Sequence, residues 1–267
     1  MVKHHNYERK INNGSVEEPD KLLKSSWLYS KTSEKQLASL LEDKVHILCW
    51  IMTSPTNLYT RAAYLKVTWT RRCNIVVFIS SEEDEDFPAV GVGGKEGGDF
   101  LWVKTRRSLQ YLYRNYINQA DWFLKADDDA YVIMENLRYF LADKDPSEPV
   151  YYGRRFKSAM NTDGYMSGGA GYIMSKVALE QLVMRSFSNQ FVCPSEQFVD
   201  LYPGLAEDSA LGVCMQAAGV TAGDTRDALG RERFHPLEAW ELLDPFYLVA
   251  PEYWLWKYSF YPSLKAA

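Results

Sequence analysis

Short apolar runs alternate with longer amphipathic stretches along most of this chain, from Val45 onward. The first run, residues 45–52, is apolar at nearly every position, as expected of a strand buried between two layers of helices. Runs of this kind predict strands at 45–52, 74–80, 121–126, 149–152 and 170–174. Apolar spacings of three and four residues predict helices at 57–69, 104–118, 175–185 and 208–218. This alternation indicates an α/β fold.

The first 44 residues are mostly polar and lack a long apolar periodicity. Near their end, Leu37, Leu40 and Leu41 have the spacing that predicts one short helix. We interpret residues 1–44 as a stem or linker and residues 45–267 as one domain.

Aromatic side chains alternate with other residues near the C-terminus. The alternation predicts a strand at 253–261, with one face formed by Trp254, Trp256, Tyr258 and Phe260. Packing in the core explains such a face, and so does a wall on which a sugar ring stacks.

The composition describes a folded chain with a sizeable core, since 46% of its 267 residues are apolar. Its 35 acidic and 30 basic residues leave no excess of positive charge, which argues against a nucleic-acid partner. The longest mainly apolar run, 45–52, is too short to span a bilayer, and residues 1–10 lack the apolar segment of a signal peptide. A membrane anchor, if there is one, is expected outside this sequence.

Four cysteines are widely spaced along the chain and lack the close pairs of a zinc finger. They are Cys49, Cys73, Cys193 and Cys214. Buried free thiols and disulfides both fit this spacing. The glycosylation sequon at Asn13 favours a secretory compartment, and therefore disulfides, by a small margin.

Residues 82–99 are rich in acidic residues and glycine, and we expect a mobile surface loop there. The glycines at 91–98 fit neither of the common phosphate-binding patterns. The acidic run at 82–86 is typical of a solvated turn.

Three aspartates, Asp127, Asp128 and Asp129, directly follow the predicted strand at 121–126. In open α/β sheets, ligands bind beyond the carboxyl ends of the strands. Neighbouring carboxylates repel one another, and a cation relieves the repulsion. Mg²⁺ or Mn²⁺ that bridges a diphosphate suits such oxygen ligands, so a nucleotide diphosphate is the expected ligand. The alternative is an aspartate-rich turn or helix cap.

Two more residues and one segment are candidates for chemistry. His235 is either structural or a metal ligand, and mixed ligation by Asp and His would favour Mn²⁺. Asp208, at the start of the predicted helix 208–218, is either the N-cap or a general base that faces a substrate. The glycines of residues 164–172 allow tight turns or close approach to a ligand.

Seven motifs, taken in order, resemble the glycosyltransferases of family 31. They are CWIMTSP (49–55), VTWTRRCN (67–74), DWFLKADDDAYVI (121–133), YYGRRFK (151–157), GYMSGGAGYIMS (164–175), EDSALGVCM (207–215) and FHP (234–236). The resemblance extends from about Val45 to Pro262. It implies a GT-A fold, in which a Rossmann-like, mostly parallel sheet is flanked by helices in a single catalytic domain.

The resemblance also implies an activity: transfer of galactose from UDP-galactose, with inversion, to the 3-hydroxyl of GalNAc α-linked to Ser or Thr of a glycopeptide or glycoprotein. Asp129 and His235 would hold Mn²⁺, with Asp127 beside them, and Asp208 would deprotonate the acceptor. The candidate donor contacts are Asp127, Asp128, Thr53, Arg61 and Lys104. The candidate acceptor contacts are Trp254, Trp256, Tyr165 and Glu207, the last only as the neighbour of Asp208.

The family further implies a type II membrane protein of the Golgi, with the catalytic domain in the lumen and the anchor outside this sequence. It pairs Cys49 with Cys73 and Cys193 with Cys214, and it leaves room for a homodimer. Related chains usually continue into a cysteine-containing tail, whereas this sequence stops at Ala267.

Two other functions fit the resemblance. One is that of a non-catalytic chaperone for the transferase, although the relative of that kind lacks the acidic motif found here at 127–129. The other is a fringe-like transfer of N-acetylglucosamine through a β1,3 linkage.

Overall fold

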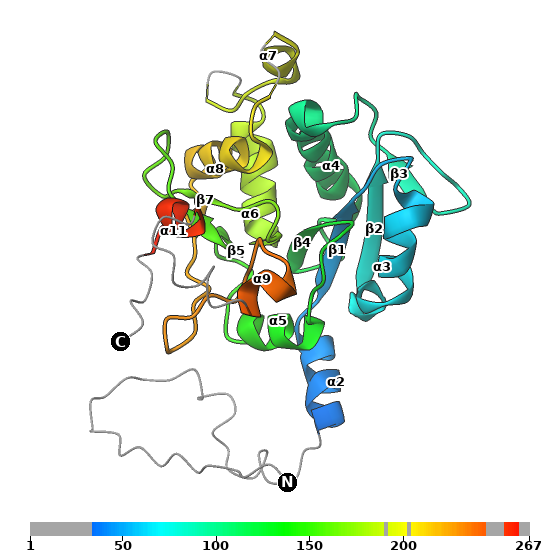
Figure 1. The fold of residues 1–267 in the computed structure, drawn as a ribbon, viewed down its shortest axis with the longest axis vertical. Coiled ribbons are helices and arrows are strands. Elements are labelled where there is room, and N and C mark those ends of the chain that lie inside the picture. The colour runs from blue at the N-terminus through cyan, green and yellow to red at the C-terminus, as the bar shows by residue number, and fades with distance from the viewer. Residues whose placement is uncertain (1–33, 190–191, 202–203, 244–253, 262–267) are drawn as a thin grey trace.

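A seven-stranded sheet forms the centre of the computed structural model, which describes residues 34–189, 192–201, 204–243 and 254–261 (Figure 1). The strand order is β3-β2-β1-β4-β8-β5-β9. The strands are β1 (Ile47–Met52), β2 (Ile75–Ser80), β3 (Ala89–Gly91), β4 (Trp122–Asp127), β5 (Val150–Gly153), β8 (Tyr172–Ser175) and β9 (Thr221–Ala222). Only β8 runs antiparallel to its two neighbours, β4 and β5. The predicted α/β class and mostly parallel sheet are confirmed.

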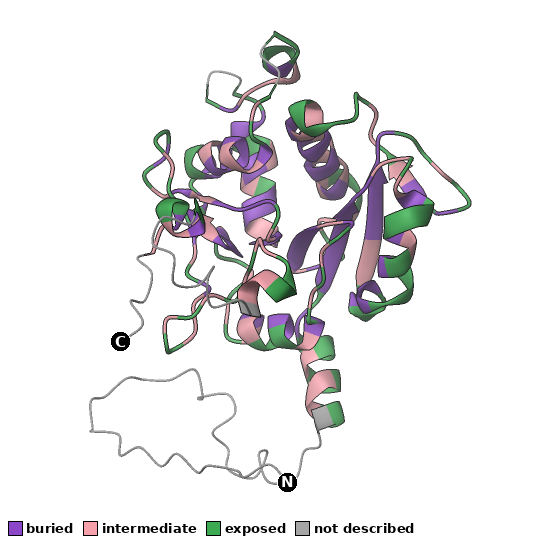
Figure 2. Ribbon diagram, in the orientation of Figure 1, coloured by how far each residue is buried: buried purple, intermediate pink, exposed green. Residues whose placement is uncertain are grey.

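Helices cover both faces of the sheet, which makes a three-layer domain. One face carries α3 (Ala63–Val67) and α5 (Met134–Leu141), and the other carries α4 (Leu101–Tyr116), α6 (Lys176–Gln181) and α8 (Glu207–Ala218). Alternate residues of β1 enter the two cores, so the whole strand is buried (Figure 2). This double burial explains why the run at 45–52 is apolar at nearly every position.

Smaller elements complete the fold. A two-stranded sheet consists of β6 (Arg155–Phe156) and β7 (Tyr165–Met166). The remaining helices are α2 (Glu34–Lys44), α7 (Glu196–Leu201), α9 (Ala239–Leu243) and α11 (Trp254–Tyr258). The predicted short helix near Leu37 is confirmed as α2, which lies against α5, and Lys44 Nζ donates to Ala142 O at 2.8 Å. The sequon at Asn13 lies outside the described residues.

The structure refines two of the predictions made from periodicity. The helix predicted at 57–69 is divided into a π-helical turn η2 (Leu58–Ala62), α3, and a 3₁₀ turn η3 (Trp69–Arg72). The predicted loop at 82–99 contains the short strand β3 and a 3₁₀ turn η4 (Gly98–Phe100). A Cβ atom at Gly91 would come within 2.3 Å of the Glu83 backbone nitrogen, so this glycine lets β3 pack closely against its own loop.

The strand predicted at 253–261 is wrong, because residues 254–258 form helix α11. Leu255 and Ser259, four residues apart, are the buried positions, whereas Trp254 and Tyr258 remain exposed. The four aromatic side chains therefore do not share a strand face. Alternation over so few residues did not distinguish a strand from one turn of helix that buries an aliphatic side chain. Residue 253 lies outside the described part of the chain.

Two disulfides have the pairing that the resemblance implied. Cys49 of β1 binds Cys73, just before β2, and Cys193 binds Cys214 of α8. The second bond ties the segment before α7 to the helix that begins at Glu207. Among the helices that the structure describes, none has the length and apolar character needed to cross a membrane.

Candidate active site

The carboxyl ends of β1 and β4 meet at one edge of the sheet, because the two strands are parallel and Met52 pairs with Asp127. Thr53 follows β1, and its Oγ1 donates to Asp128 Oδ2 at 2.8 Å. Both side chains are buried. Two of the candidate donor contacts, Thr53 and Asp128, are therefore hydrogen-bonded to each other at the edge where α/β sheets bind ligands.

Two cationic side chains lie beside this pair. Arg61, from η2, places Nη1 3.7 Å from Asp128 Oδ1 and 3.4 Å from Asp129 Oδ2. Lys104, from α4, donates to the Thr53 carbonyl oxygen and to Glu96 Oε1, the latter at 2.7 Å. The structure thus brings together four of the five donor candidates, and each of the two cations is paired with carboxylates there.

A pocket of about 970 Å³ lies beside the aspartates. Asp127, Asp129 and His235 line it together, although His235 is more than a hundred residues away in sequence. The pocket also has an apolar part formed by α5, α9 and the segment before α9, where it is lined by Ile133, Leu137, Phe140, Phe234, Leu237 and Leu242. The candidate metal ligands therefore share one cavity.

His235 is suited to metal binding by its protonation state. It is exposed, but loss of hydration against the surrounding protein lowers the pKa of its imidazole, and the nearby Arg154 charge lowers that pKa further. A lower pKa favours the neutral imidazole, which is the form that binds a metal.

The protein alone does not supply a complete metal site within the described residues, because no three His, Cys, Asp or Glu side chains there converge closely enough to hold an ion. A cation bound by Asp129 and His235 would need further ligands from water or from the substrate. Diphosphate oxygens are ligands of that kind. Asp129 and His235 carry the carboxylate and imidazole groups that Mn²⁺ binds, and both line this pocket.

Asp208 lies in the first turn of α8 and is not its N-cap. The helix begins at Glu207, the N-cap position is Ala206, and no side chain caps it. Asp208 Oδ2 accepts a hydrogen bond from the Gly168 backbone N–H at 3.0 Å, and Oδ1 accepts one from Ser209 N–H at 2.8 Å. The N-cap interpretation is wrong, while the general-base role stays a prediction.

A glycine-rich turn connects Asp208 with the pocket. Gly169, Ala170 and Gly171 line the pocket, and the preceding residue, Gly168, binds Asp208. Asp208 itself is not among the residues that line the pocket. Asp208 is therefore bound to the residue that directly precedes the pocket-lining segment 169–171.

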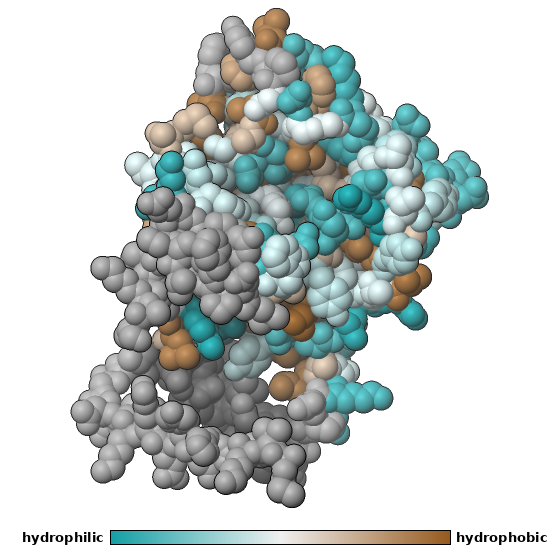
Figure 3. Space-filling view, in the orientation of Figure 1, coloured by the Kyte–Doolittle hydropathy of each residue, from teal (hydrophilic) through white to brown (hydrophobic). Residues whose placement is uncertain are grey.

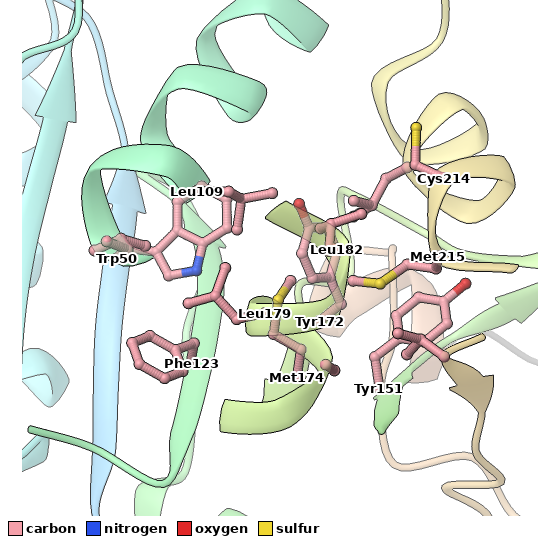
Figure 4. Close-up of a cluster of buried hydrophobic side chains, with 14 of the residues drawn as sticks. Trp50, Leu109, Phe123, Tyr151, Tyr172, Met174, Leu179, Leu182, Cys214 and Met215 are labelled. Carbon is pink, nitrogen blue, oxygen red and sulfur yellow. The ribbon is translucent and has the colours of Figure 1, made fainter. Parts of the chain in front are cut away.

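Glu207 is buried beneath Asp208 and does not face solvent. Its Oε1 accepts hydrogen bonds from Tyr172 OH at 2.8 Å and Thr105 Oγ1 at 3.0 Å. Figure 4 shows Tyr172 among the core side chains, beside Trp50 and Met174. Burial raises the pKa of Glu207. This position suits a supporting role better than contact with an acceptor.

Lys125 is a site residue that the sequence interpretation missed. It lies in β4 with a side-chain exposure of 1%, and its Nζ is 2.6 Å from Asp127 Oδ1 and 3.0 Å from Gly168 O. Burial alone would lower the pKa of Lys125, but Asp127 and Glu207 more than offset this and raise it. The available signal was one lysine inside the otherwise apolar strand 122–126.

The candidate acceptor residues lie in different environments. The rings of Tyr165 and Trp254 each lie 5.9 Å from the ring of Phe156. Burial raises the pKa of Tyr165, and the Asp208 carboxylate raises it further. Trp256 instead lies 5.9 Å from the Arg154 guanidinium. Tyr165 and Trp254 are therefore grouped around Phe156, whereas Trp256 is not.

Comparison with known proteins gives a consistent family assignment. A family model described as Fringe-like matches residues 42–245. Glycoprotein-N-acetylgalactosamine 3-beta-galactosyltransferase 1 of Xenopus laevis is 45% identical over 232 residues, which cover 87% of this chain and 62% of that protein. Beta-1,3-glucosyltransferase of Mus musculus is 27% identical over 162 residues, or 60% of this chain and 31% of that protein. This chain thus spans less than two thirds of the length of each of these relatives.

Among solved structures, that of a 4-diphosphocytidyl-2C-methyl-D-erythritol synthase from Anaerococcus prevotii aligns with 61% of this chain and 84% of that one. The TM-score is 0.37 and the identity is 11%, too low to bear on the fold or the function. The family model, by contrast, covers the sheet, the aspartates, Asp208 and His235. This chain therefore belongs to the Fringe-like family, which is the glycosyltransferase family 31 that its motifs resemble.

Proposed function

We propose that this chain transfers galactose from UDP-galactose to the 3-hydroxyl of GalNAc α-linked to Ser or Thr of a glycoprotein, with inversion and with Mn²⁺. The observation that carries the choice of sugar and acceptor is the 45% identity to the Xenopus galactosyltransferase over 87% of this chain. The arrangement of carboxylates and cations at the ends of β1 and β4 supports the use of a nucleotide-sugar donor.

Asp129 and His235 would hold the Mn²⁺, with Asp127 beside them in the same pocket. When bound, the ion supplies Lewis-acid stabilisation of the departing diphosphate. Arg61 and Lys104 add positive charge on the neighbouring side of the aspartates. Thr53 fixes the carboxylate of Asp128 by a hydrogen bond, so this group is oriented before a donor enters.

Asp208 acts as the general base. Its carboxylate takes the proton from the 3-hydroxyl of GalNAc as that oxygen bonds to the anomeric carbon of galactose, and the bond from that carbon to the UDP oxygen breaks. UDP leaves with the electron pair of the broken bond. The Gly168 N–H holds one carboxylate oxygen, which limits the orientations from which Asp208 can accept the proton.

Tyr165 and Trp254 form the acceptor side of the site. Both rings pack on Phe156, and the partly exposed ring of Trp254 (40%) is of the kind that stacks on a sugar. Trp256, beside Arg154, and the buried Glu207 belong to the structural support of this region.

The compartment is the lumen of the Golgi, reached by a type II membrane protein. Two buried disulfides support this part of the proposal, because such bonds persist in oxidising compartments.

A screen of UDP-sugars against acceptors in the presence of Mn²⁺ tests the proposal. We expect transfer from UDP-galactose to a GalNAc-bearing peptide and no transfer to the same peptide without GalNAc. A preference for UDP-N-acetylglucosamine would favour a fringe-like activity, which the name of the matched family model makes the second candidate. Intact UDP binding without any transfer would favour the chaperone-like role.

A further inference from the structure

A buried ammonium group connects the two sides of the candidate site. Lys125 and Asp127 project from the same face of β4, since they are two residues apart in a strand. On this face Lys125 Nζ contacts Asp127 Oδ1 at 2.6 Å and donates to Gly168 O at 3.0 Å. One cation therefore touches a carboxylate of the pocket and the backbone of the glycine-rich turn.

Gly168 is hydrogen-bonded to both Lys125 and Asp208 and so connects them. Its carbonyl oxygen accepts from Lys125 Nζ and from Gly171 N–H at 3.0 Å, while its own N–H donates to Asp208 Oδ2 at 3.0 Å. Gly168 is thus bound by Lys125 and Gly171 through its carbonyl oxygen, and it binds Asp208 through its N–H.

The packing around Gly168 leaves little freedom for this arrangement. A Cβ atom there would come within 2.9 Å of Glu207 Oε2 and 3.6 Å of Lys125 Nζ. Glu207 in turn is fixed by Tyr172 and Thr105. The surrounding side chains therefore restrict where Gly168, and with it Asp208, can lie.

We infer that Lys125 is a positioning residue. Its ammonium holds both the carboxylate of Asp127 and the backbone of Gly168, and through Gly168 it keeps the carboxylate of Asp208 in a fixed position relative to Asp127. The inference rests on the proposed function in so far as it treats Asp208 as the base. Lys125 also lines the pocket beside Asp127, but the role inferred here is exerted through Asp127 and Gly168.

The test compares two buried cations. The double variant Lys125→Met with Glu207→Gln removes the ammonium together with one buried carboxylate, which limits the charge left unpaired. Arg138→Met is the matched control, because Arg138 is equally buried and binds the backbone carbonyls of Val45 and Arg72 at the opposite end of β1. Both variants are assayed per folded molecule for kcat and for the KM of donor and acceptor.

We expect kcat of the double variant to fall about 100-fold with little change in the KM of the acceptor, as for a misplaced catalytic group. The Arg138→Met protein should keep the wild-type kcat. If the double variant does not fold, Lys125→Arg serves in its place, because it keeps the charge but replaces the compact ammonium with a planar guanidinium, and it should also lower kcat. A wild-type kcat in the folded variant overturns the inference.

Hydrogen–deuterium exchange gives a readout that does not depend on activity. Loss of Lys125 should speed exchange of the Gly168 amide roughly fivefold or more, while Arg138→Met should leave it unchanged. If the wild-type protein transfers no sugar and exchange still responds to Lys125, the proposed function fails and the positioning role stands. Unchanged exchange at Gly168 overturns the positioning role, whatever the activity.

Discussion

Both oxygens of the Asp208 carboxylate accept hydrogen bonds from backbone amides, one from Ser209 in its own helix and one from Gly168. From its position in the sequence alone, Asp208 was favoured as a helix cap over a general base. The structure excludes the cap, because the helix begins one residue earlier. The contact with Gly168 could not be predicted, since it joins residues 40 positions apart.

Replacing Asp208 by Asn should abolish the base while keeping the shape of the side chain. We expect kcat to fall roughly 10²- to 10⁴-fold, with UDP binding in the presence of Mn²⁺ close to that of the wild-type protein. Initial rates and calorimetric titration with UDP measure the two effects. Asp163→Asn, at a half-exposed carboxylate between β6 and β7, is the control and should remain active. An Asp208→Asn protein with the wild-type rate would place the base elsewhere.

His235 should contribute directly to metal affinity. His235→Ala is expected to raise the Mn²⁺ concentration needed for half-maximal activity at least about tenfold, since removal of a ligand costs no less than removal of a group that orients one. His46→Ala is a matched control, because His46 lies near Asp121 at the opposite end of the sheet. An identical Mn²⁺ titration for wild type and His235→Ala would remove His235 from the metal ligands.

At the scale of elements, α4 connects the site to the segment that precedes α8. Arg107 of α4 donates to both oxygens of Glu196, at the start of α7, with distances of 3.0 and 2.6 Å. Cys193, three residues earlier, is bonded to Cys214 of α8. An ion pair and a disulfide therefore hold the short helix α7 in place.

The ion pair should make part of the stability depend on pH. The Arg107 hydrogen bonds lower the pKa of Glu196 despite its partial burial. A carboxylate with a lowered pKa stabilises the fold above the pKa of the unfolded chain, and this contribution disappears as the pH falls through the lower, folded pKa. Urea unfolding should show Glu196→Gln less stable than wild type by up to about 1 kcal/mol at neutral pH, with the difference vanishing in acid. A difference that is the same at all pH values would contradict this account.

Loss of the disulfide between Cys193 and Cys214 should destabilise the fold more than loss of the Arg107–Glu196 ion pair. The bond closes a loop with a sequence separation of 21, so the double change of Cys193 and Cys214 to Ala is expected to cost about 3 kcal/mol of the free energy of unfolding. Met184→Ala, at an exposed position of the nearby turn η5 (Leu182–Ser186), should change it by less than about 0.5 kcal/mol. Equal unfolding midpoints for the disulfide variant and the wild type would show that the loop is held by packing alone.

The elements that the sequence predicted well are those buried on both faces. Strands β1, β2 and β4 consist mainly of apolar residues, and their ends lie within two residues of the predictions. The short strands β3 and β9, with three and two residues, leave no periodicity to detect. Helix α11 was taken for a strand because its buried position is occupied by Leu255, while larger aromatic side chains beside it are exposed.

At the scale of the whole molecule, the sequence predicted the layers of the domain but not the strand order. β8 enters the sheet between β4 and β5 and runs antiparallel to both, which brings the glycine-rich turn before it next to the aspartates after β4. The position of β8 between β4 and β5 therefore brings residue 168, which binds residue 208, close to residue 127. Local apolar patterns carry no information on which strands become neighbours, so Lys125 and Gly168 could not be connected from the sequence.

The visible surface gives no single hydrophobic face to which a partner could be assigned. Figure 3 shows mostly hydrophilic residues on this side, with hydrophobic residues scattered among them. Isolated exposed apolar side chains are normal for a folded protein. The homodimer therefore stays a prediction.

The most direct test of the central claim is the structure of the reaction product. The protein, with UDP-galactose, Mn²⁺ and a peptide bearing α-linked GalNAc, should yield a disaccharide whose NMR spectrum shows galactose in β linkage to the 3-oxygen of GalNAc. An α linkage, attachment at another oxygen, or an unmodified acceptor in the presence of folded protein would contradict the account.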